Sequence, residues 1–175
     1  CIGVSTAECI PVLLYDEEHH AVAAIHAGWR GTLARIVHKA MQEMAFAYKT
    51  EPKHLKAVIG PGISMENFEV GDEVYEAFEQ AAFPMEKIAA QYPNAAFKAN
   101  PEERERVAAE GNIDQPLKWH INLPLCNKEI LIHCGVLEEN IHDCGICTFA
   151  HSDEYFSARK LGTDSGRIYS AIMLK

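Results

Sequence analysis

The sequence lacks the features that would place the chain in a membrane or on a nucleic acid. None of its apolar runs approaches the roughly 18 residues that a membrane span needs. The 16 basic residues are outnumbered by 25 acidic ones, which gives a formal net charge of −9. A chain this acidic is poorly suited to hold a phosphate backbone by bulk charge. We therefore expect neither a membrane nor a nucleic acid as partner.

Internal repeats, low-complexity tracts and the charged and apolar regions of a signal peptide are also missing. The chain has six cysteines, but nothing else in it points to secretion, so reduced thiols in the cytoplasm are favoured over disulfides. It begins with Cys1, in a stretch that already has the pattern of a strand. We expect it to be the C-terminal part of a longer protein.

What remains is the composition of an ordinary globular domain. The 175 residues are 48% hydrophobic and 23% charged, enough for one domain with its own core. Apolar periodicity predicts a hairpin over residues 10–26 and a helix over 33–48 capped by Thr32. Further helices are predicted at 72–82 and 123–134, and further strands at 55–59, 119–121, 141–148 and 167–174. Because these elements alternate without a regular βαβ order, we predict an α+β fold with mixed β-sheets and flanking helices.

The predicted hairpin carries a thiol and an imidazole at the same end. Cys9 precedes its first strand and His26 lies near the end of its second. Adjacent strands lie about 4.8 Å apart, so the two side chains can meet. Such a pair can ligate zinc or act as nucleophile and base. A buried structural cysteine beside an unrelated histidine is the alternative, and spacing alone favours it.

Two segments have the residues expected of an anion site. His26-Ala27-Gly28-Trp29-Arg30-Gly31 combines glycines, a stacking ring and a guanidinium fork. Residues 157–167 place Arg159, Lys160 and Arg167 close together in an otherwise acidic chain. The alternatives are a turn with an apolar anchor for the first segment and a solvated loop for the second. We favour the functional interpretation for the first.

Other motifs are weaker. Cys144 and Cys147 form a single CxxC, which could be a redox dithiol or half of a zinc site, but no second CxxC and no thioredoxin-like context accompany it. The turn Gly60-Pro61-Gly62 lacks the ending of a P-loop and the pattern of a dinucleotide-binding turn.

Together these motifs resemble the laccase-domain family, also called the multicopper polyphenol oxidase-like, YfiH or peptidoglycan-editing-factor family. The hexapeptide from His26 to Gly31 is the most specific match. The other matching stretches follow in order along nearly the whole chain: residues 5–13, 59–64, 68–71, 147–148, 155–159 and 166–167.

The resemblance implies a single domain over residues 1–175 that lacks its N-terminal part, with an α+β fold related to Cys–His deamidase toxin domains. It implies a purine nucleoside phosphorylase acting on adenosine, inosine, guanosine and methylthioadenosine, with adenosine deaminase activity. Purine nucleosides and phosphate would then be its small-molecule partners. The family metal site has two histidines and one cysteine, which map to Cys9, to His26 and to an upstream histidine outside this chain.

The resemblance also assigns roles within the site. Cys9 and His26 would hold zinc, with copper as the alternative metal, and together with Arg30 would form the catalytic set. Ser157, Arg159 and Arg167 would join Arg30 in binding phosphate or ribose. The family usually has Asp before the metal cysteine, where this chain has Glu8, and an Arg-Arg pair where it has Arg159-Lys160.

Three other functions stay open. One is a copper-dependent polyphenol oxidase, although the chain has no His-x-His motif and its nine histidines are scattered, unlike a set that would build several copper sites. Another is a metal-free hydrolase or deamidase with Cys9 as nucleophile and His26 as base. The last is a purine-sensing domain that binds nucleosides without turnover.

Overall fold

The computed structural model describes residues 1–93 and 117–175. They divide into two compact units. The first comprises residues 1–64 and 123–175, and the second residues 65–122. All of the residues predicted for the candidate site belong to the first unit.

The first unit is built around a four-stranded sheet. Its strands are β2 (Ile10–Asp16), β3 (Ala21–Ala27), β4 (Leu55–Ile59) and β8 (Ile141–Asp143), in the order β3-β2-β4-β8. β2 pairs antiparallel with β3 and β4, whereas β4 and β8 are parallel, so the sheet is mixed as predicted. Strand β8 is shorter than the predicted segment 141–148.

The β2–β3 hairpin confirms the prediction for residues 10–26. Its turn is closed by Asp16, whose Oδ1 accepts the backbone N–H groups of Glu18 and His19 at 3.0 and 3.1 Å. Along β2, Ile10, Val12 and Leu14 are fully buried and form the centre of the core. Such alternate burial is what a strand with one face on a core requires.

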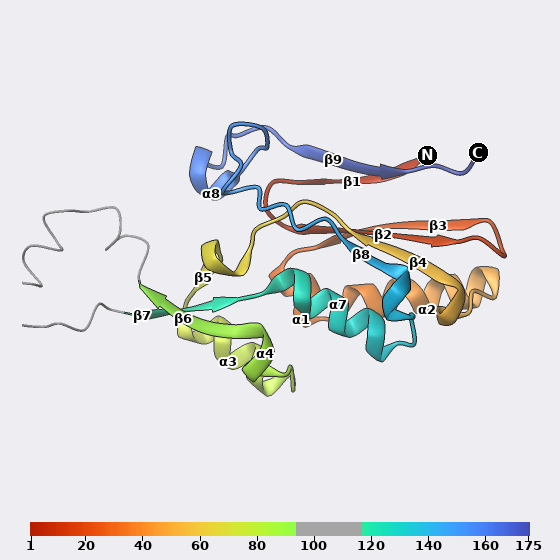
Figure 1. Cartoon of the computed structure of the whole chain (residues 1–175), viewed down its shortest axis with the longest axis horizontal. Helices are drawn as coiled ribbons and strands as arrows, with labels where there is room; N and C mark the ends of the chain where they lie inside the picture. The colour runs from red at the N-terminus through yellow and green to blue at the C-terminus, as the bar shows by residue number, and fades with distance from the viewer. Residues whose placement is uncertain (94–116) are drawn as a thin grey trace, which may run out of the picture. The chain divides into compact units, whose positions relative to one another are not determined.

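Two further layers cover this sheet (Figure 1). Helices α1 (Trp29–Leu33), α2 (Ile36–Tyr48) and α7 (Leu123–His133) lie on one side, with α2 against β3 and α7 against β4. On the other side lies a two-stranded antiparallel ribbon of β1 (Ile2–Thr6) and β9 (Ile168–Ile172). A short helix, α8 (Ala158–Leu161), precedes β9 in the chain.

The predicted single helix over residues 33–48 is wrong at its start. Arg35 adopts a left-handed conformation with φ of 54°, which separates α1 from α2. Thr32 is not a cap but lies inside α1, fully buried, where its Oγ1 accepts a hydrogen bond from Asn127 Nδ2 at 3.1 Å. This contact with α7 comes from a residue 95 positions along the chain, so local periodicity could not indicate it.

The second unit holds a smaller antiparallel sheet in the order β5-β7-β6. Its strands are β5 (Glu69–Val70), β6 (Ala89–Pro93) and β7 (Leu117–Ile121), with helices α3 (Asp72–Gln80) and α4 (Met85–Ile88). Tyr75 of α3 stacks on Trp119 of β7 with ring centroids 3.9 Å apart, which fixes the helix on the sheet.

The remaining elements are short 3₁₀ turns at Pro52–His54, Met65–Asn67 and Glu138–Asn140. Gly135 ends α7 with φ of +95°, which confirms it as the predicted C-terminal cap. Among the described residues, every helix is too short or too polar to cross a lipid bilayer. The chain thus has a mixed α/β architecture with several sheets.

Candidate active site

The centre of the candidate site is the open end of the β2–β3 hairpin. Pro11 pairs with His26 in the register of the two strands, and Cys9 directly precedes the first paired residue of β2, Ile10. A Cβ atom added to Gly28 would lie 2.9 Å from Cys9 Sγ and 4.0 Å from His26 Nε2. The thiol and the imidazole therefore both lie within 4.0 Å of one position, which carries no side chain because residue 28 is glycine.

The backbone before Cys9 is held in an unusual conformation. Glu8 has φ of 123°, a region that residues with a side chain rarely adopt. Its carbonyl oxygen accepts the N–H of Ile63 at 2.8 Å. Backbone strain of this kind persists only where the surroundings impose it, and it is concentrated at functional sites.

The Gly60-Pro61-Gly62 turn supplies part of those surroundings. The N–H of Gly60 donates to the Pro11 carbonyl at 2.9 Å. A Cβ on Gly62 would approach Ile10 Cδ1 to 2.4 Å and the Glu8 carbonyl oxygen to 3.0 Å. This turn, which sequence reasoning could not connect to any ligand, is therefore the wall against which the Cys9 segment packs.

Cys9 is held mainly as a neutral thiol. Burial raises the pKa of the Cys9 thiol above its ordinary value, and the neighbouring Glu8 carboxylate raises it further. A thiol in such an environment is a poor free nucleophile at neutral pH. A bound cation would reverse the balance, because a coordinating thiol is deprotonated.

Arg30 lies on α1, directly after the hairpin. Its guanidinium lies over the ring of Trp29, 4.1 Å from the ring centroid, and the side chain is exposed. Helix α1 is held by Asn127, which donates from Nδ2 to Thr32 Oγ1 and to the Leu123 carbonyl oxygen. Asn127 was missed in the sequence because its partner Thr32 lies 95 residues away.

Ser157 and Arg159 come to the Cys9 segment from the far end of the chain. Ser157 Oγ donates to Glu8 Oε1 at 2.5 Å, and the backbone N–H of Arg159 donates to the same oxygen at 3.0 Å. Ser157 is fully buried. Glu8 thus links two predicted site segments, the one at Cys9 and the one at Ser157 and Arg159. In the sequence it stands out only as a departure from the family pattern.

Arg167 is bound to its own loop. Its guanidinium donates to the carbonyl oxygens of Ser165, Gly166 and Thr163 at 2.5, 3.0 and 3.4 Å. The Phe156 ring packs on Gly166, where a Cβ would lie only 2.6 Å from Phe156 Cζ. These contacts connect the two halves of the segment from 155 to 167.

The CxxC motif is not paired as a disulfide. All six cysteines lie within the described residues and are free. Cys147 is buried, and its backbone forms an isolated parallel β-bridge with Gly62. Its Sγ accepts the Ser64 N–H at 3.3 Å. Cys144 is half-buried, and burial raises the pKa of its thiol.

The described residues form no complete metal-binding cluster around Cys9 and His26. Over residues 1–93 and 117–175 there is no group of three or more His, Cys, Asp and Glu side chains that could hold a metal ion. Cys9 and His26 are the two predicted ligands that lie near one another within these residues.

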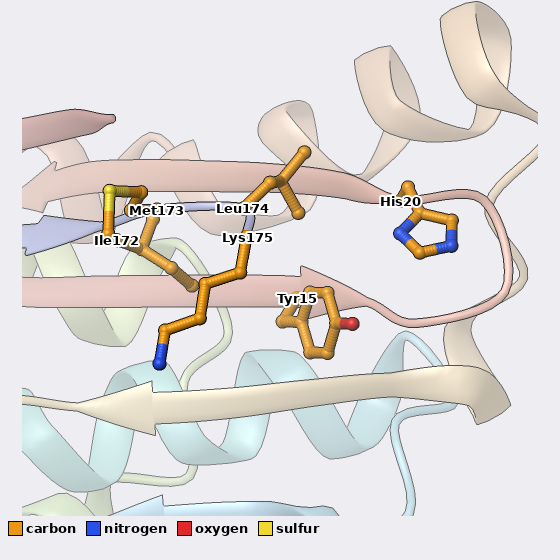
Figure 2. Close-up of a pocket in the computed structure, with 6 residues that line it drawn as sticks. All are labelled: Tyr15, His20, Ile172, Met173, Leu174 and Lys175. Atoms are coloured by element: carbon orange, nitrogen blue, oxygen red, sulfur yellow. The ribbon is translucent and has the colours of Figure 1, made fainter.

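A separate cavity lies at the other end of the hairpin (Figure 2). It measures about 350 Å³ and is lined by Tyr15, His20 and residues 172–175. Tyr15 and Cys9 are six residues apart on an extended strand, which corresponds to about 20 Å. The cavity shares no residue with the candidate site.

Known proteins similar to this chain carry enzyme names. A purine nucleoside phosphorylase of Bacteroides thetaiotaomicron is 41% identical over 174 residues, which is 99% of this chain and 57% of that protein. A protein named adenosine deaminase RL5, from an unknown prokaryotic organism, is 37% identical, with 99% of this chain and 58% of that protein covered. This chain thus spans somewhat more than half of the relatives it matches.

Solved structures with a similar fold are also known. The crystal structure of Bacillus licheniformis hypothetical protein YfiH matches with a TM-score of 0.74 and 25% identity, covering 95% of this chain and 55% of that one. Neisseria meningitidis protein NMB0706 matches with a TM-score of 0.64 and 31% identity, covering 95% and 57%. The family described as multi-copper polyphenol oxidoreductase laccase matches residues 1–175. The chain belongs to this laccase-like family, as its sequence motifs predicted.

Proposed function

We propose that the intact protein is a zinc-dependent purine nucleoside phosphorylase with adenosine deaminase activity. The observation that carries the proposal is the approach of Cys9 Sγ and His26 Nε2 to one space kept open by Gly28. The names of the two relatives described above support the two reactions. Adenosine, inosine, guanosine and methylthioadenosine are the proposed substrates, with phosphate as the co-substrate.

The donor set fits the proposed metal. A thiolate and an imidazole are the ligands that zinc prefers, and catalytic zinc sites use three protein ligands with one open position. We assign two of the three to Cys9 and His26 and the third to the upstream histidine that the family resemblance implies. When bound, zinc supplies a Lewis acid that polarises a substrate group.

The chain's own cations would position phosphate. Arg30 is the strongest candidate, because it follows the hairpin that carries His26 and stacking on Trp29 limits the orientations of its guanidinium fork. Arg159 is the second, since its backbone is bound to the residue before Cys9. Arg167 would stabilise this region indirectly, because its guanidinium donates to carbonyl oxygens of the loop from 163 to 166. In phosphorolysis the guanidiniums of Arg30 and Arg159 would neutralise phosphate as it approaches C1′ of the ribose.

The motif suggests that Ser157 binds phosphate or ribose, but the proposal gives it a structural role. Its hydroxyl proton is directed to Glu8, and its oxygen accepts the N–H of Lys160 at 3.3 Å. The hydroxyl is therefore occupied within the protein. We propose that Ser157 shapes the phosphate-binding segment and that the contact to phosphate comes from Arg159.

A metal-free cysteine hydrolase is less favoured, because both burial and Glu8 raise the pKa of the Cys9 thiol. Copper chemistry on phenols is suggested by the family description and is the alternative that metal analysis must test. We propose a cytoplasmic location, which the six free cysteines support.

The test is chromatography of adenosine and inosine after incubation with the intact zinc-loaded protein, with and without phosphate, beside Cys9→Ala. With the wild-type protein, we expect adenine and hypoxanthine only when phosphate is present, and inosine from adenosine without phosphate. The Cys9→Ala variant should form none of these products. Metal content measured on the same samples separates zinc from copper. Unchanged nucleosides with the wild-type protein would overturn the purine assignment.

A further inference from the structure

Three hydrogen bonds connect the turn before Cys9 to the start of α8. The Glu8 carboxylate accepts from Ser157 Oγ and from the Arg159 N–H through one oxygen, Oε1, at 2.5 and 3.0 Å. Next to it, the Ala7 carbonyl accepts the Ala158 N–H at 3.3 Å. The two segments are about 150 residues apart in the sequence, 149 for Glu8 and Ser157, so this link is entirely tertiary.

The link continues into the helix. Ser157 is the N-terminal cap of α8, and its Oγ accepts the Lys160 N–H at 3.3 Å. Because the single hydroxyl proton goes to Glu8, the serine acts as a relay between the carboxylate and the helix. Glu8 thereby orders residues 157–160, both directly at Arg159 and through Ser157 at Lys160.

The backbone of Glu8 shows that this arrangement is costly. At φ of 123° glycine would be the favoured residue, yet the chain has a glutamate there. Glycine would remove the strain but would also remove the carboxylate. The side chain at this position therefore does something that backbone conformation alone does not require.

We propose that Glu8 is a positioning residue that couples the metal-ligand segment at Cys9 to the phosphate-binding segment at Arg159. This inference rests on the proposed function for its chemical meaning. Glu8 sets where the Arg159 backbone lies relative to Cys9, and so where its guanidinium can meet phosphate. Loss of the carboxylate should impair the use of phosphate more than the use of nucleoside.

The experiment compares Glu8→Gln, which removes the charge, with Glu8→Gly, which removes the side chain and also relieves the backbone strain. Glu17→Gln is the matched control, because Glu17 is an exposed glutamate paired with Lys56 at the opposite end of β2. All variants are made in the intact zinc-loaded protein. The measurements are amide hydrogen exchange, binding of inorganic phosphate, zinc content, and KM for phosphate and for inosine.

In Glu8→Gly we expect the Arg159 and Lys160 amides to exchange about tenfold faster, with α2 unchanged. The Kd for inorganic phosphate and the KM for phosphate should rise about tenfold, the equivalent of one lost charge-assisted hydrogen bond. KM for inosine and zinc content should stay within about twofold of the wild type. Glu8→Gln should change the same quantities in the same direction by a smaller factor, and Glu17→Gln none of them.

Two results would overturn the proposal. One is unchanged exchange at Arg159 together with unchanged phosphate binding in Glu8→Gly. The other is a parallel loss of zinc, of inosine affinity and of thermal stability, which is what a merely structural residue would give. If the wild-type protein shows no phosphorolysis, the proposed function fails by itself, whereas exchange and binding of inorganic phosphate still decide the role of Glu8.

Discussion

Two cysteines lie on opposite sides of the same glycine turn and meet opposite environments. On one side Gly62 packs against the carbonyl groups of Glu8 and Cys9. On the other side Gly62 forms a bridge with Cys147, whose Sγ accepts the Ser64 N–H. Both cysteines lie in stretches that match the family, but the sequence predicts a metal-ligand role for Cys9 alone.

Their thiols differ in which hydrogen-bond donors face them. Burial raises the pKa of the Cys9 thiol, and the Glu8 carboxylate adds to the effect. Burial also acts on Cys147, but hydrogen bonds from Ser64 and from the backbone of Ala150 and Phe149 outweigh it, so the pKa of that thiol is lowered. The lone pairs of Cys147 are thus used by the protein, whereas Cys9 borders the open space shared with His26.

The largest effect should come from removing the imidazole beside Cys9. His26→Ala should weaken zinc binding by more than the roughly 100-fold typical of a change outside the ligand sphere, because it deletes one of the proposed ligands. Zinc affinity is measured by competition with a chromophoric chelator, and phosphorolysis is measured on the same samples.

Cys147→Ala is the matched control for this comparison. It removes a thiol on the other side of the Gly62 turn and should retain zinc at the wild-type stoichiometry. Loss of zinc from Cys147→Ala, with zinc kept in His26→Ala, would reverse the assignment of the two regions.

The contrast between the two regions also shows what local sequence can predict. The β2–β3 hairpin follows from two apolar runs around a polar turn, and its register brings Cys9 near His26. The break at Arg35 has no glycine or proline to mark it, and the contact between Thr32 and Asn127 joins residues 95 positions apart. The Glu8–Ser157 bond joins segments from the two ends of the chain, so only the folded structure reveals it.

The packing of Gly62 against the Cys9 segment can be tested by adding a methyl group at this glycine. Gly62→Ala would place a Cβ 2.4 Å from the buried Ile10 Cδ1 and 3.0 Å from the Glu8 carbonyl oxygen. Because the backbone at Glu8 cannot yield easily, we expect a loss of about 1–3 kcal/mol of stability. Urea denaturation of the variant and the wild type measures the difference. A change of less than about 0.5 kcal/mol, which is ordinary for a surface substitution, would contradict tight packing on this side.

The open space beside Cys9 gives a smaller and different effect. Gly28→Ala would place a Cβ 2.9 Å from Cys9 Sγ, the end of a side chain that can rotate away. Stability should change by less than about 1 kcal/mol, because no backbone atom is displaced. Zinc affinity should fall about tenfold, since the thiol turns from the space it shares with His26. Unchanged zinc affinity would show that the space is not the metal site.

The smallest effect concerns the pH dependence of stability on the Cys147 side. A thiol whose pKa is lowered by folding stabilises the protein above its unfolded-state pKa, near the ordinary 9.0, and loses that contribution as pH falls through the lowered value. Wild-type protein should therefore gain stability relative to Cys147→Ala as the pH is raised from 7 toward 9 under reducing conditions. Urea denaturation across this range measures the gain. Cys126→Ala is the counterpart, because burial raises the pKa of the Cys126 thiol to about 12 and the sign reverses above pH 9. Parallel curves for wild type and Cys147→Ala would mean that the Ser64 N–H does not favour the thiolate, and the distinction between the two cysteines would then rest on the open space beside Cys9 alone.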